Sequence, residues 1–258
     1  MLFDLENVGF AEGHNQAIAL SKSDYCLVLN PDVVLSPEYV ERLVAFAERH
    51  PDAGGLTGKL VSAASSERID STGIAVKKSR RAIDRGASEP AHAYDQSQEV
   101  FGVSGAAAFY SRKMIDDLMI DGEFFDEDFF AYKEDVDISW RGRLLGWKFY
   151  YVADAEAEHV RKWQAGKRRE QSPSIRSHSL MNRWFMMVKN DSWAYYLRHA
   201  GYILAYDLAV IGYVLLKERE LLKHIMRLMP LFPKMVKKRK LIRSRKRAHD
   251  REIFQFFE

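Results

Sequence analysis

The chain has 258 residues, 47% of them hydrophobic and 29% charged, which allows one large domain with an appendage and excludes a wholly disordered protein. Its single cysteine, Cys26, lies in an apolar run, which excludes a disulfide framework and fits a reducing compartment. The net charge of +3 is uneven: residues 223–247 carry 11 Lys and Arg and no acid, which leaves −8 for the rest of the chain.

The first segment with a clear pattern, residues 7–15, reads Asn-Val-Gly-Phe-Ala-Glu-Gly-His-Asn. Gly9 and Gly13 predict a tight loop that leads into a helix over residues 16–21. The backbone amides of such a loop could bind a phosphate group at the start of the helix. The segment lacks the lysine of a P-loop and the glycine spacing of a dinucleotide-binding loop, so a plain loop remains the alternative.

A short apolar run at residues 25–29 predicts a strand buried on both faces, and it ends abruptly in Asn30-Pro31-Asp32. A helix capped by Ser36 is predicted to follow. In open α/β sheets, ligands bind beyond the carboxyl ends of the strands, which is where Asp32 falls. Its carboxylate suits Mg²⁺ or Mn²⁺, although Asn-Pro-Asp is also a common turn.

The middle of the chain, residues 55–110, is predicted to be rich in strands and loops, with a polar surface loop at residues 79–95. Residues 100–110 are apolar, with small side chains at Ser104 and Gly105. Small residues let the backbone come close to a ligand or to another element. This stretch is therefore expected to continue the α/β domain.

An acidic helix is predicted over residues 134–145, and it starts with Glu134 and Asp135. Acids at a helix start often only cap the helix or interact with its dipole. The functional interpretation is that Asp135 is a general base, whose pKa the aromatic residues 129–132 raise by partial dehydration. Trp140, within the same helix, fits either the core or a surface that stacks on a sugar.

A strand is predicted at residues 148–152, and His159 follows it. A lone histidine is more often structural than a metal ligand. Its position after the strand that follows the acidic helix favours the functional interpretation. With Asp32 it could complete a mixed oxygen and nitrogen site for Mg²⁺ or Mn²⁺.

Toward the C-terminus the pattern becomes helical, after a basic and polar loop at residues 161–176. Residues 201–216 are apolar on all sides except at Asp207, and as a helix they would span roughly 24 Å, less than a ~30 Å hydrocarbon core. With the basic residues 234–247, they predict a segment that lies on a membrane surface or re-enters it. A buried helical hairpin of a soluble protein is the alternative.

Taken together, these segments resemble the family 2 glycosyltransferases, and within them the rhamnosyltransferase-like enzymes of cell-surface polysaccharide assembly. The resemblance extends over about residues 5–160, and the tail is similar to the C-terminal helices of such enzymes. Four motifs carry it in the family's order, namely the glycine loop at 7–15, the metal and diphosphate motif at 29–32, the strand under the acceptor at 104–106 and the catalytic segment at 129–137.

The resemblance implies a GT-A-type α/β fold, in which helices flank a Rossmann-like mixed sheet and a C-terminal helical extension associates with a membrane. We expect a glycosyltransferase domain at residues 1–160, a basic linker at 161–181, and amphipathic helices with a basic tail at 182–258. Family members begin with a strand, a helix and a second strand, so we expect roughly 60 residues of the nucleotide-binding half to be missing. A misassigned start, a truncated gene and a second chain that supplies this half are the alternatives.

By the same resemblance, Asp135 matches the catalytic base, and Glu134 helps to place a substrate. Asp32 and His159 match metal ligands. The residues expected to contact the donor and its diphosphate are Asn7, Gly9, Phe10, Gly13, Asn15, Asn30 and Asp32. Those expected to contact the acceptor are Ser104, Gly105, Ala106 and Trp140.

The implied activity is inverting transfer of a sugar to a polyprenyl-linked glycan, with L-rhamnose from dTDP-rhamnose or another nucleotide sugar as donor and Mg²⁺ or Mn²⁺ as cofactor. The expected location is the cytoplasmic face of the bacterial inner membrane, on anionic lipid, as a peripheral or re-entrant protein. A truncated, catalytically inactive remnant that binds a membrane or a partner is the alternative. Nucleic acid is not an expected partner, because no aromatic residues interleave the basic cluster.

Overall fold

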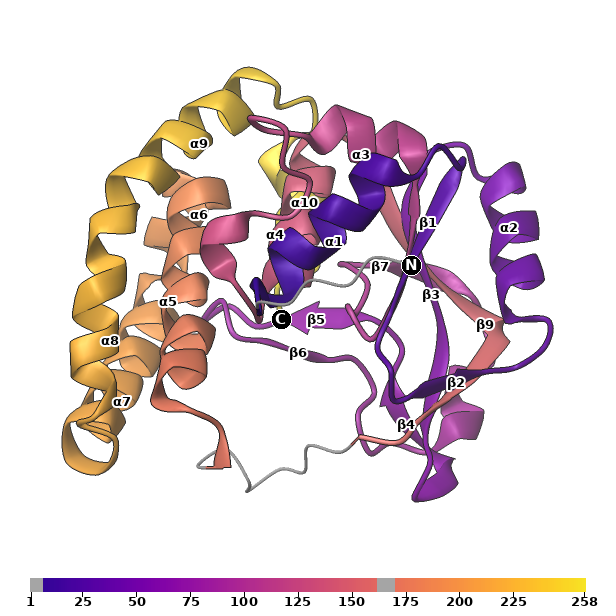
Figure 1. The fold of residues 1–258 in the computed structure, drawn as a ribbon, viewed down its shortest axis with the longest axis horizontal. Coiled ribbons are helices and arrows are strands. Elements are labelled where there is room, and N and C mark those ends of the chain that lie inside the picture. The colour runs from indigo at the N-terminus through magenta and orange to yellow at the C-terminus, as the bar shows by residue number, and fades with distance from the viewer. Residues whose placement is uncertain (1–6, 162–169) are drawn as a thin grey trace.

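The computed structural model describes residues 7–161 and 170–258 and shows a mixed sheet flanked by helices (Figure 1). Its strands are β1 (Tyr25–Leu29), β2 (Val33–Leu35), β3 (Ala53–Ser62), β4 (Ser65–Ser71), β5 (Ile74–Val76), β6 (Ala82–Asp84), β7 (Gln98–Val100), β8 (Ala107–Ser111) and β9 (Lys148–His159). Seven of these strands form the main sheet among the described residues, in the order β1-β8-β3-β9-β2, with β4 paired to β3 and β7 paired to β9. The β5–β6 hairpin forms a separate sheet.

Helices cover both faces of the main sheet. They are α1 (Gly9–Leu20), α2 (Tyr39–Arg49), α3 (Arg112–Leu118), α4 (Glu134–Leu144), α5 (Pro173–Asn190), α6 (Trp193–Arg198), α7 (Ala200–Lys217), α8 (Leu221–Leu228), α9 (Phe232–Ser244) and α10 (Asp250–Phe254). Short 3-10 turns occur at η1 (Ala91–Tyr94), η2 (Glu127–Phe129) and η4 (Met229–Leu231). This arrangement confirms the predicted α/β class with a C-terminal helical region.

The core lies on both sides of the sheet because neighbouring residues of a strand point to opposite faces. In β8, Phe109 packs in the core beneath α2, with Tyr39 and Leu43 of that helix. The next residue, Tyr110, packs on the opposite face, in the core that includes Ile138 and Trp140 of α4. Helix α2 therefore covers one face alone, while α3, α4 and the C-terminal helices contribute to the other.

Strand pairing brings two distant polar segments together at one end of the sheet. Strand β9 runs parallel to β3, and β2 pairs with β9 in antiparallel register, with Val33 opposite His159. The residue before β2 is Asp32, and its carbonyl accepts a hydrogen bond from Val160 at 2.8 Å. Asp32 and His159 are thus neighbours because of the sheet register.

Several predicted boundaries differ from the structure. Helix α1 begins at Gly9 rather than at residue 16, so most of the glycine segment is helical and not a loop. Helix α2 begins at Tyr39, and Ser36 contributes through its carbonyl, which accepts the amide of Tyr39 at 3.1 Å. Strand β9 is longer than predicted and includes His159 as its last residue.

The expected linker at residues 161–181 is also shorter than predicted. Helix α5 begins at Pro173, with Ser172 as its N-cap, so the last nine positions of that segment are helical. Residues 162–169 of the expected basic loop, and residues 1–6 of the expected first domain, lie outside the described part of the chain.

The C-terminal helices α7, α8 and α9 form the outer rim of the molecule (Figure 1). Helix α7 is long and apolar enough to cross a membrane, and only 11% of it is buried against the rest of the structure. The alternative of a buried hairpin is therefore wrong for α7. The basic tail is not exposed at every position, because Lys238 of α9 is 3% exposed and pairs with Asp126 at 2.6 Å.

Candidate active site

Most of the predicted site residues meet in one cavity of about 450 Å³ at the end of the sheet. The predicted residues that line it are Phe10, Asn30, Asp32, Ser104, Gly105, Ala106, Glu134, Asp135 and His159. They come from α1, from the turn after β1, from the segment before β8, from α4 and from β9. The fold thus assembles one cleft from segments far apart in the sequence.

At one end of this cavity, a carboxylate and an imidazole lie together. Oδ1 of Asp32 is 3.3 Å from Nε2 of His159, and Nδ1 of His159 is 2.7 Å from Oδ2 of Asp70. Burial alone would lower the pKa of His159, but the hydrogen bond and charge of Asp70, with the charge of Asp32, outweigh it and raise the pKa. Asp70 therefore fixes the ring so that Nε2 points at Asp32.

This pair fits a divalent cation. Mg²⁺ and Mn²⁺ in substrate complexes are bound by one or two protein ligands, with phosphate oxygens and water completing the shell. A metal-binding histidine commonly donates its second ring N–H to a carboxylate, which is the role that Asp70 can take. Among residues 7–161 and 170–258 no group of three or more His, Cys, Asp or Glu could hold a metal, so the remaining ligands would have to come from substrate and water.

The sequence analysis missed Asp70 and its partners. Arg161 reaches Oδ1 of Asp70 with Nε at 2.6 Å and Oδ2 of Asp84 with Nη2 at 2.5 Å, and both Arg161 and Asp84 line the cavity. Asp70 lies in β4, whose first four residues are exposed while the last three are buried. A buried acid at that position carries no periodic signal, so only the three-dimensional pairing with His159 reveals it.

At the other end of the cavity, Asp135 is held by backbone amides. Its Oδ2 accepts the amide of Gly105 at 2.9 Å, and its Oδ1 accepts the amide of Val136 at 2.8 Å. Burial raises the pKa of Asp135 above the usual range, although both hydrogen bonds favour the charged form. The small residue Gly105 matters here because its backbone approaches the carboxylate directly.

The neighbouring carboxyl, Glu134, is buried more deeply. Burial, followed by the charge of Asp135, raises the pKa of Glu134 to about 8. Its Oε2 has no hydrogen-bond partner among the described residues, which also favours the neutral acid. The site therefore holds two adjacent carboxyl groups, and burial raises the pKa of both.

The loop before α4 has an unusual backbone conformation. Phe130, Tyr132 and Lys133 have φ values of 58°, 71° and 68°, in the left-handed region that side chains other than glycine rarely adopt. Such strain costs about 1–3 kcal/mol per residue and persists only where surrounding contacts hold it. In α5, the Asn182 side chain donates to the carbonyls of Phe129, Ala131 and Tyr132 at 2.8–2.9 Å.

The glycine segment holds the same loop from the other side. The carbonyl of Phe130 accepts the amide of Phe10 at 2.7 Å. At Gly9, whose φ is +86°, a Cβ would lie 2.6 Å from that carbonyl oxygen, so no larger residue fits. The side chain of Asn15 bonds both the amide and the carbonyl of Phe125, at 2.9 and 2.8 Å.

These contacts concern residues that are predicted to contact the donor. Gly9, Gly13 and Asn15 lie outside the cavity lining, and Asn7 accepts the amide of Gly9 at 3.1 Å. Gly9 and Asn15 contact the segment that leads to Asp135, and the donor contacts of Asn7, Gly9, Gly13 and Asn15 stay a prediction. Phe10 alone of this segment lines the cavity.

The structure contradicts the prediction that Trp140 contacts the acceptor. It is fully buried and packs edge-on against Phe101, Phe254 and Phe257 on the far side of α4 from the cavity lining. It cannot contact an acceptor, because no part of it reaches the surface. The core interpretation, which the sequence left open for this residue, is the right one.

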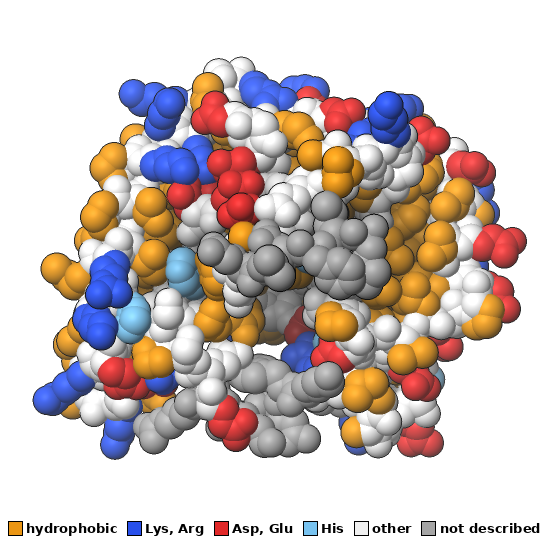
Figure 2. All heavy atoms as spheres, viewed as in Figure 1, with side chains coloured by type: hydrophobic (Ala, Val, Ile, Leu, Met, Phe, Trp, Pro, Cys, Tyr) orange, Lys and Arg blue, Asp and Glu red, His pale blue; other side chains and the backbone are white. Residues whose placement is uncertain are grey.

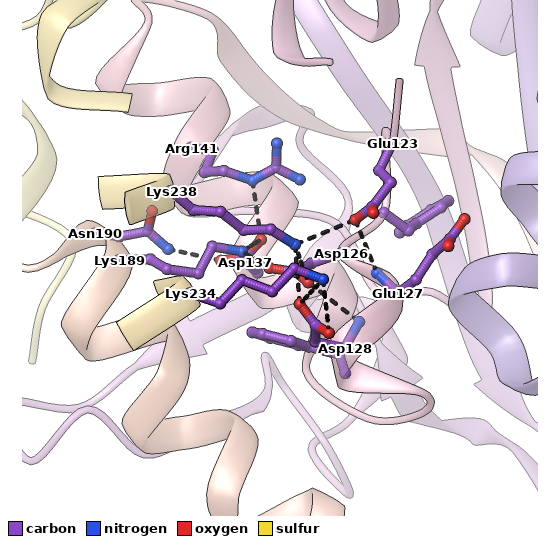
Figure 3. A network of polar contacts seen from close by, with 12 residues as sticks. Glu123, Asp126, Glu127, Asp128, Asp137, Arg141, Lys189, Asn190, Lys234 and Lys238 are labelled. Carbon is purple, nitrogen blue, oxygen red and sulfur yellow. Dashed lines mark hydrogen bonds and ion pairs between the residues drawn. The ribbon is translucent and has the colours of Figure 1, made fainter. Parts of the chain in front are cut away.

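Behind the cavity, a buried ionic network joins α4 to the C-terminal helices (Figure 3). Lys189 of α5 lies 2.5 Å from Asp126 and 2.8 Å from Asp137, and Lys238 of α9 lies 2.6 Å from the other oxygen of Asp126. Burial opposes the charge of Asp126, but the two lysines outweigh it and hold its pKa well below the usual range. Arg141 completes the network at 2.9 Å from Asp137.

Comparison with solved structures agrees with the fold. The crystal structure of GalNAc-T7 with UDP, GalNAc and Mn²⁺ superposes with a TM-score of 0.53 and 12% identity, covering 72% of this chain and 35% of that one. The crystal structure of S. aureus TarS 1-349 superposes with a TM-score of 0.51 and 13% identity, covering 94% of this chain and 72% of that one. The sheet flanked by helices is therefore of the GT-A type.

Sequence comparison identifies a family and enzymes that are similar to this chain. The N-acetylglucosaminyl-diphospho-decaprenol L-rhamnosyltransferase of Mycobacterium tuberculosis, from strains H37Rv and CDC 1551, is 27% identical over 189 residues, or 66% of this chain. The match covers 57% of that enzyme's length. A family profile described as "Glycosyltransferase like family 2" matches residues 3–187, most of the chain. The protein therefore belongs to the glycosyltransferase-like family 2.

Proposed function

We propose that the protein is an inverting, metal-dependent glycosyltransferase that transfers a sugar from a nucleotide donor to a lipid-linked glycan. The observation that carries the proposal is one cavity lined both by the Asp32–His159 pair and by Asp135, in a chain of this family. The name of the mycobacterial relative supports L-rhamnose as the sugar and a polyprenyl diphosphate glycan as the acceptor. The donor dTDP-rhamnose is implied by the family resemblance alone.

The reaction is a single displacement. Asp135 accepts the proton of the acceptor hydroxyl, whose oxygen forms a bond to the anomeric carbon while the bond from that carbon to the diphosphate oxygen breaks. The nucleoside diphosphate leaves with the electron pair, and the anomeric configuration inverts. A divalent ion bound by Asp32 and His159 would supply positive charge to the departing diphosphate.

Turnover with defined substrates tests this proposal. The purified chain should release dTDP from dTDP-rhamnose when given Mn²⁺ and a polyprenyl-diphosphate N-acetylglucosamine acceptor, and release little without the acceptor. UDP-glucose and GDP-mannose serve as comparison donors under the same conditions. Failure to bind any nucleotide sugar in the presence of Mn²⁺ would instead support the catalytically inactive remnant.

Loss of the Asp32 carboxylate should uncouple donor binding from metal. In the Asp32→Ala variant, we expect Mn²⁺ to no longer tighten donor binding, as measured by calorimetry with and without Mn²⁺. In Asp70→Asn, which weakens the support of His159 and the ion pair with Arg161 but leaves Asp32 and His159 in place, we expect about a 10–100-fold weaker apparent Mn²⁺ affinity. Equal Mn²⁺ dependence in the wild type and Asp32→Ala would exclude Asp32 as a ligand.

The raised pKa of Glu134 makes stability dependent on pH. Because the folded-state pKa of about 8 exceeds the ordinary value of 4.5, the folded state binds this proton more tightly, and stability falls as pH rises between the two values. The Glu134→Gln variant lacks the titratable group and should not lose this stability as the pH rises. The Tm of the variant minus the Tm of the wild type should therefore increase from pH 5 to pH 9. A difference that stays constant over this range would contradict the raised pKa.

We also propose that the C-terminal helices attach the protein to the cytoplasmic face of the bacterial inner membrane. Figure 2 shows hydrophobic side chains interspersed with Lys and Arg along the edge formed by α7, α8 and α9. Leu208 and Leu216 of α7 are about 70% exposed, and Lys237 and Lys240 of α9 have no acidic partner among the described residues. Sedimentation with anionic vesicles, but not with neutral vesicles or RNA at the same salt, is the expected result.

A further inference from the structure

A second cavity, of about 990 Å³, adjoins the candidate active site. Asp84, Lys133 and Arg161 line both cavities, so the two lie next to each other. The second cavity is bounded by the β5–β6 hairpin on one side and by α5 and α7 on the other. The proposed transfer reaction gives this second cavity no role.

The hairpin side of this cavity carries cations that are not neutralised. Arg81 is exposed and has no acidic partner among the described residues. Arg85 donates from Nη1 to the hydroxyl of Thr72 at 2.8 Å, and its guanidinium lies 5.0 Å from the centre of the Tyr94 ring, with no acid paired to it in the described chain. By contrast, Arg183 in the same cavity is neutralised by Asp207 at 2.5 Å. Guanidinium groups without an acidic partner favour phosphate oxygens, and the contacts of Arg85 hold its guanidinium in place.

The opposite side of the cavity carries apolar side chains beside the Arg183–Asp207 ion pair. Tyr206 and Val210 of α7 face the cavity, with Leu180 and Trp184 of α5 beside them. The outer faces of α7 carry exposed apolar side chains, of which Leu208 is 70% exposed. A ligand that fills this cavity therefore meets unpaired positive charge on the hairpin side and apolar side chains on the side of α5 and α7.

We infer that this second cavity binds the diphosphate of an isoprenoid-linked acceptor, with Arg81 and Arg85 on the phosphate oxygens and the isoprenoid chain along α7. The acceptor sugar then lies in the part of the cleft that Lys133 shares with Asp135. The inference rests on the proposed function, because it assigns the acceptor side of that same reaction. Two guanidinium groups match the charge of a diphosphate diester.

Acceptor kinetics test the charged side of the cavity. In the Arg81→Gln/Arg85→Gln double variant, we expect the KM for a polyprenyl-diphosphate N-acetylglucosamine acceptor to rise at least about 10-fold, since a hydrogen bond to a charged group contributes about 1.5–3 kcal/mol. We expect kcat and the Kd for the donor to stay within about threefold. The matched control is Arg49→Gln, because Arg49 is an exposed arginine of α2 outside both cavities. An unchanged acceptor KM in the double variant would overturn the inference.

Direct binding distinguishes a lipid headgroup from free phosphate. The probes are geranylgeranyl diphosphate, geranylgeraniol and inorganic pyrophosphate, titrated into the wild type and the double variant in detergent below its critical micelle concentration. Tighter binding of geranylgeranyl diphosphate than of the other two, lost in the double variant, supports the inference. Pyrophosphate that binds as tightly as the lipid overturns the isoprenoid part, and geranylgeraniol that binds equally overturns the role of the arginines.

Different results would contradict the proposed transfer reaction and the proposed isoprenoid diphosphate site. A wild-type chain that binds geranylgeranyl diphosphate but no nucleotide sugar contradicts the proposed transfer reaction and leaves the lipid site standing. A chain that transfers sugar with an acceptor KM indifferent to Arg81 and Arg85 contradicts the lipid site alone. Thermal melting of each variant verifies that loss of binding is not loss of folding.

Discussion

Replacing Asp135 by Asn is expected to lower the rate of sugar transfer by a factor of about 10²–10⁴, which is the usual contribution of a positioned general base. The amide can still accept one of the two backbone hydrogen bonds, from Gly105 or Val136, so the side chain should stay in place. It cannot accept the proton of the acceptor hydroxyl. The measurement is the rate of nucleoside diphosphate release at saturating donor and acceptor, together with the donor Kd, which should stay within about threefold.

The matched control for Asp135→Asn is Glu134→Gln. Because Glu134 is protonated at neutral pH according to its raised pKa, the amide resembles the form already present, and the variant should retain most of its turnover near pH 7. Turnover of Asp135→Asn close to that of the wild type would remove Asp135 from the role of base. A larger loss in Glu134→Gln than in Asp135→Asn would exchange the two assignments.

Replacing Lys189 by Met is expected to destabilise the fold by about 3 kcal/mol, at the lower end of the 3–5 kcal/mol typical for a broken buried ion pair. The side chain is 1% exposed and lies between Asp126 and Asp137. Both acids keep a second cation, Lys238 and Arg141 respectively, which limits the loss. For a chain of this size the Tm should fall by roughly 6–12 °C, measured by calorimetry.

Lys234→Met is the control for this effect. Lys234 pairs with Asp128 at the exposed edge of the same network, where its side chain is 45% exposed. An exposed pair contributes about 0–1 kcal/mol, so its loss should shift the Tm by no more than about 4 °C. Equal shifts in the two variants would show that the buried position of Lys189 contributes nothing of its own.

The sequence located many residues that line the candidate site, but not the residues that hold them in place. Asn30-Pro31-Asp32 and Glu134-Asp135 could be found because strand ends and helix starts have local signatures. His159 was expected beyond its strand, whereas the strand contains it. The alternation after Val152 carried that signal, since Ala153, Ala155 and Ala157 are buried and the acids between them are exposed.

The residues that hold the loop before Asp135 could not be predicted, because they act through contacts between segments that are distant in the sequence. Asn182 lies about 50 residues from the carbonyls that it holds, and no local pattern marks it among the polar residues of α5. For the glycine segment the sequence predicts either a phosphate-binding loop or a plain loop, because glycine spacing alone cannot tell what approaches the backbone. At Gly9 the approaching group is the carbonyl of Phe130. Likewise, the sequence does not reveal that Lys238 of the tail is paired, because its acidic partners Asp126 and Asp128 precede it by more than 100 residues.

The ionic network of Lys189 and Lys238 affects how the protein unfolds. Helices α5 and α9 share buried ion pairs with the segment that leads to Asp135. We therefore do not expect the parts before and after the boundary near residue 160 to unfold independently. We expect a single cooperative unfolding transition rather than two. A fragment that stops before α5 would leave Asp126 and Asp137 without these lysines and would expose the apolar side of α4, which predicts aggregation rather than a smaller working unit.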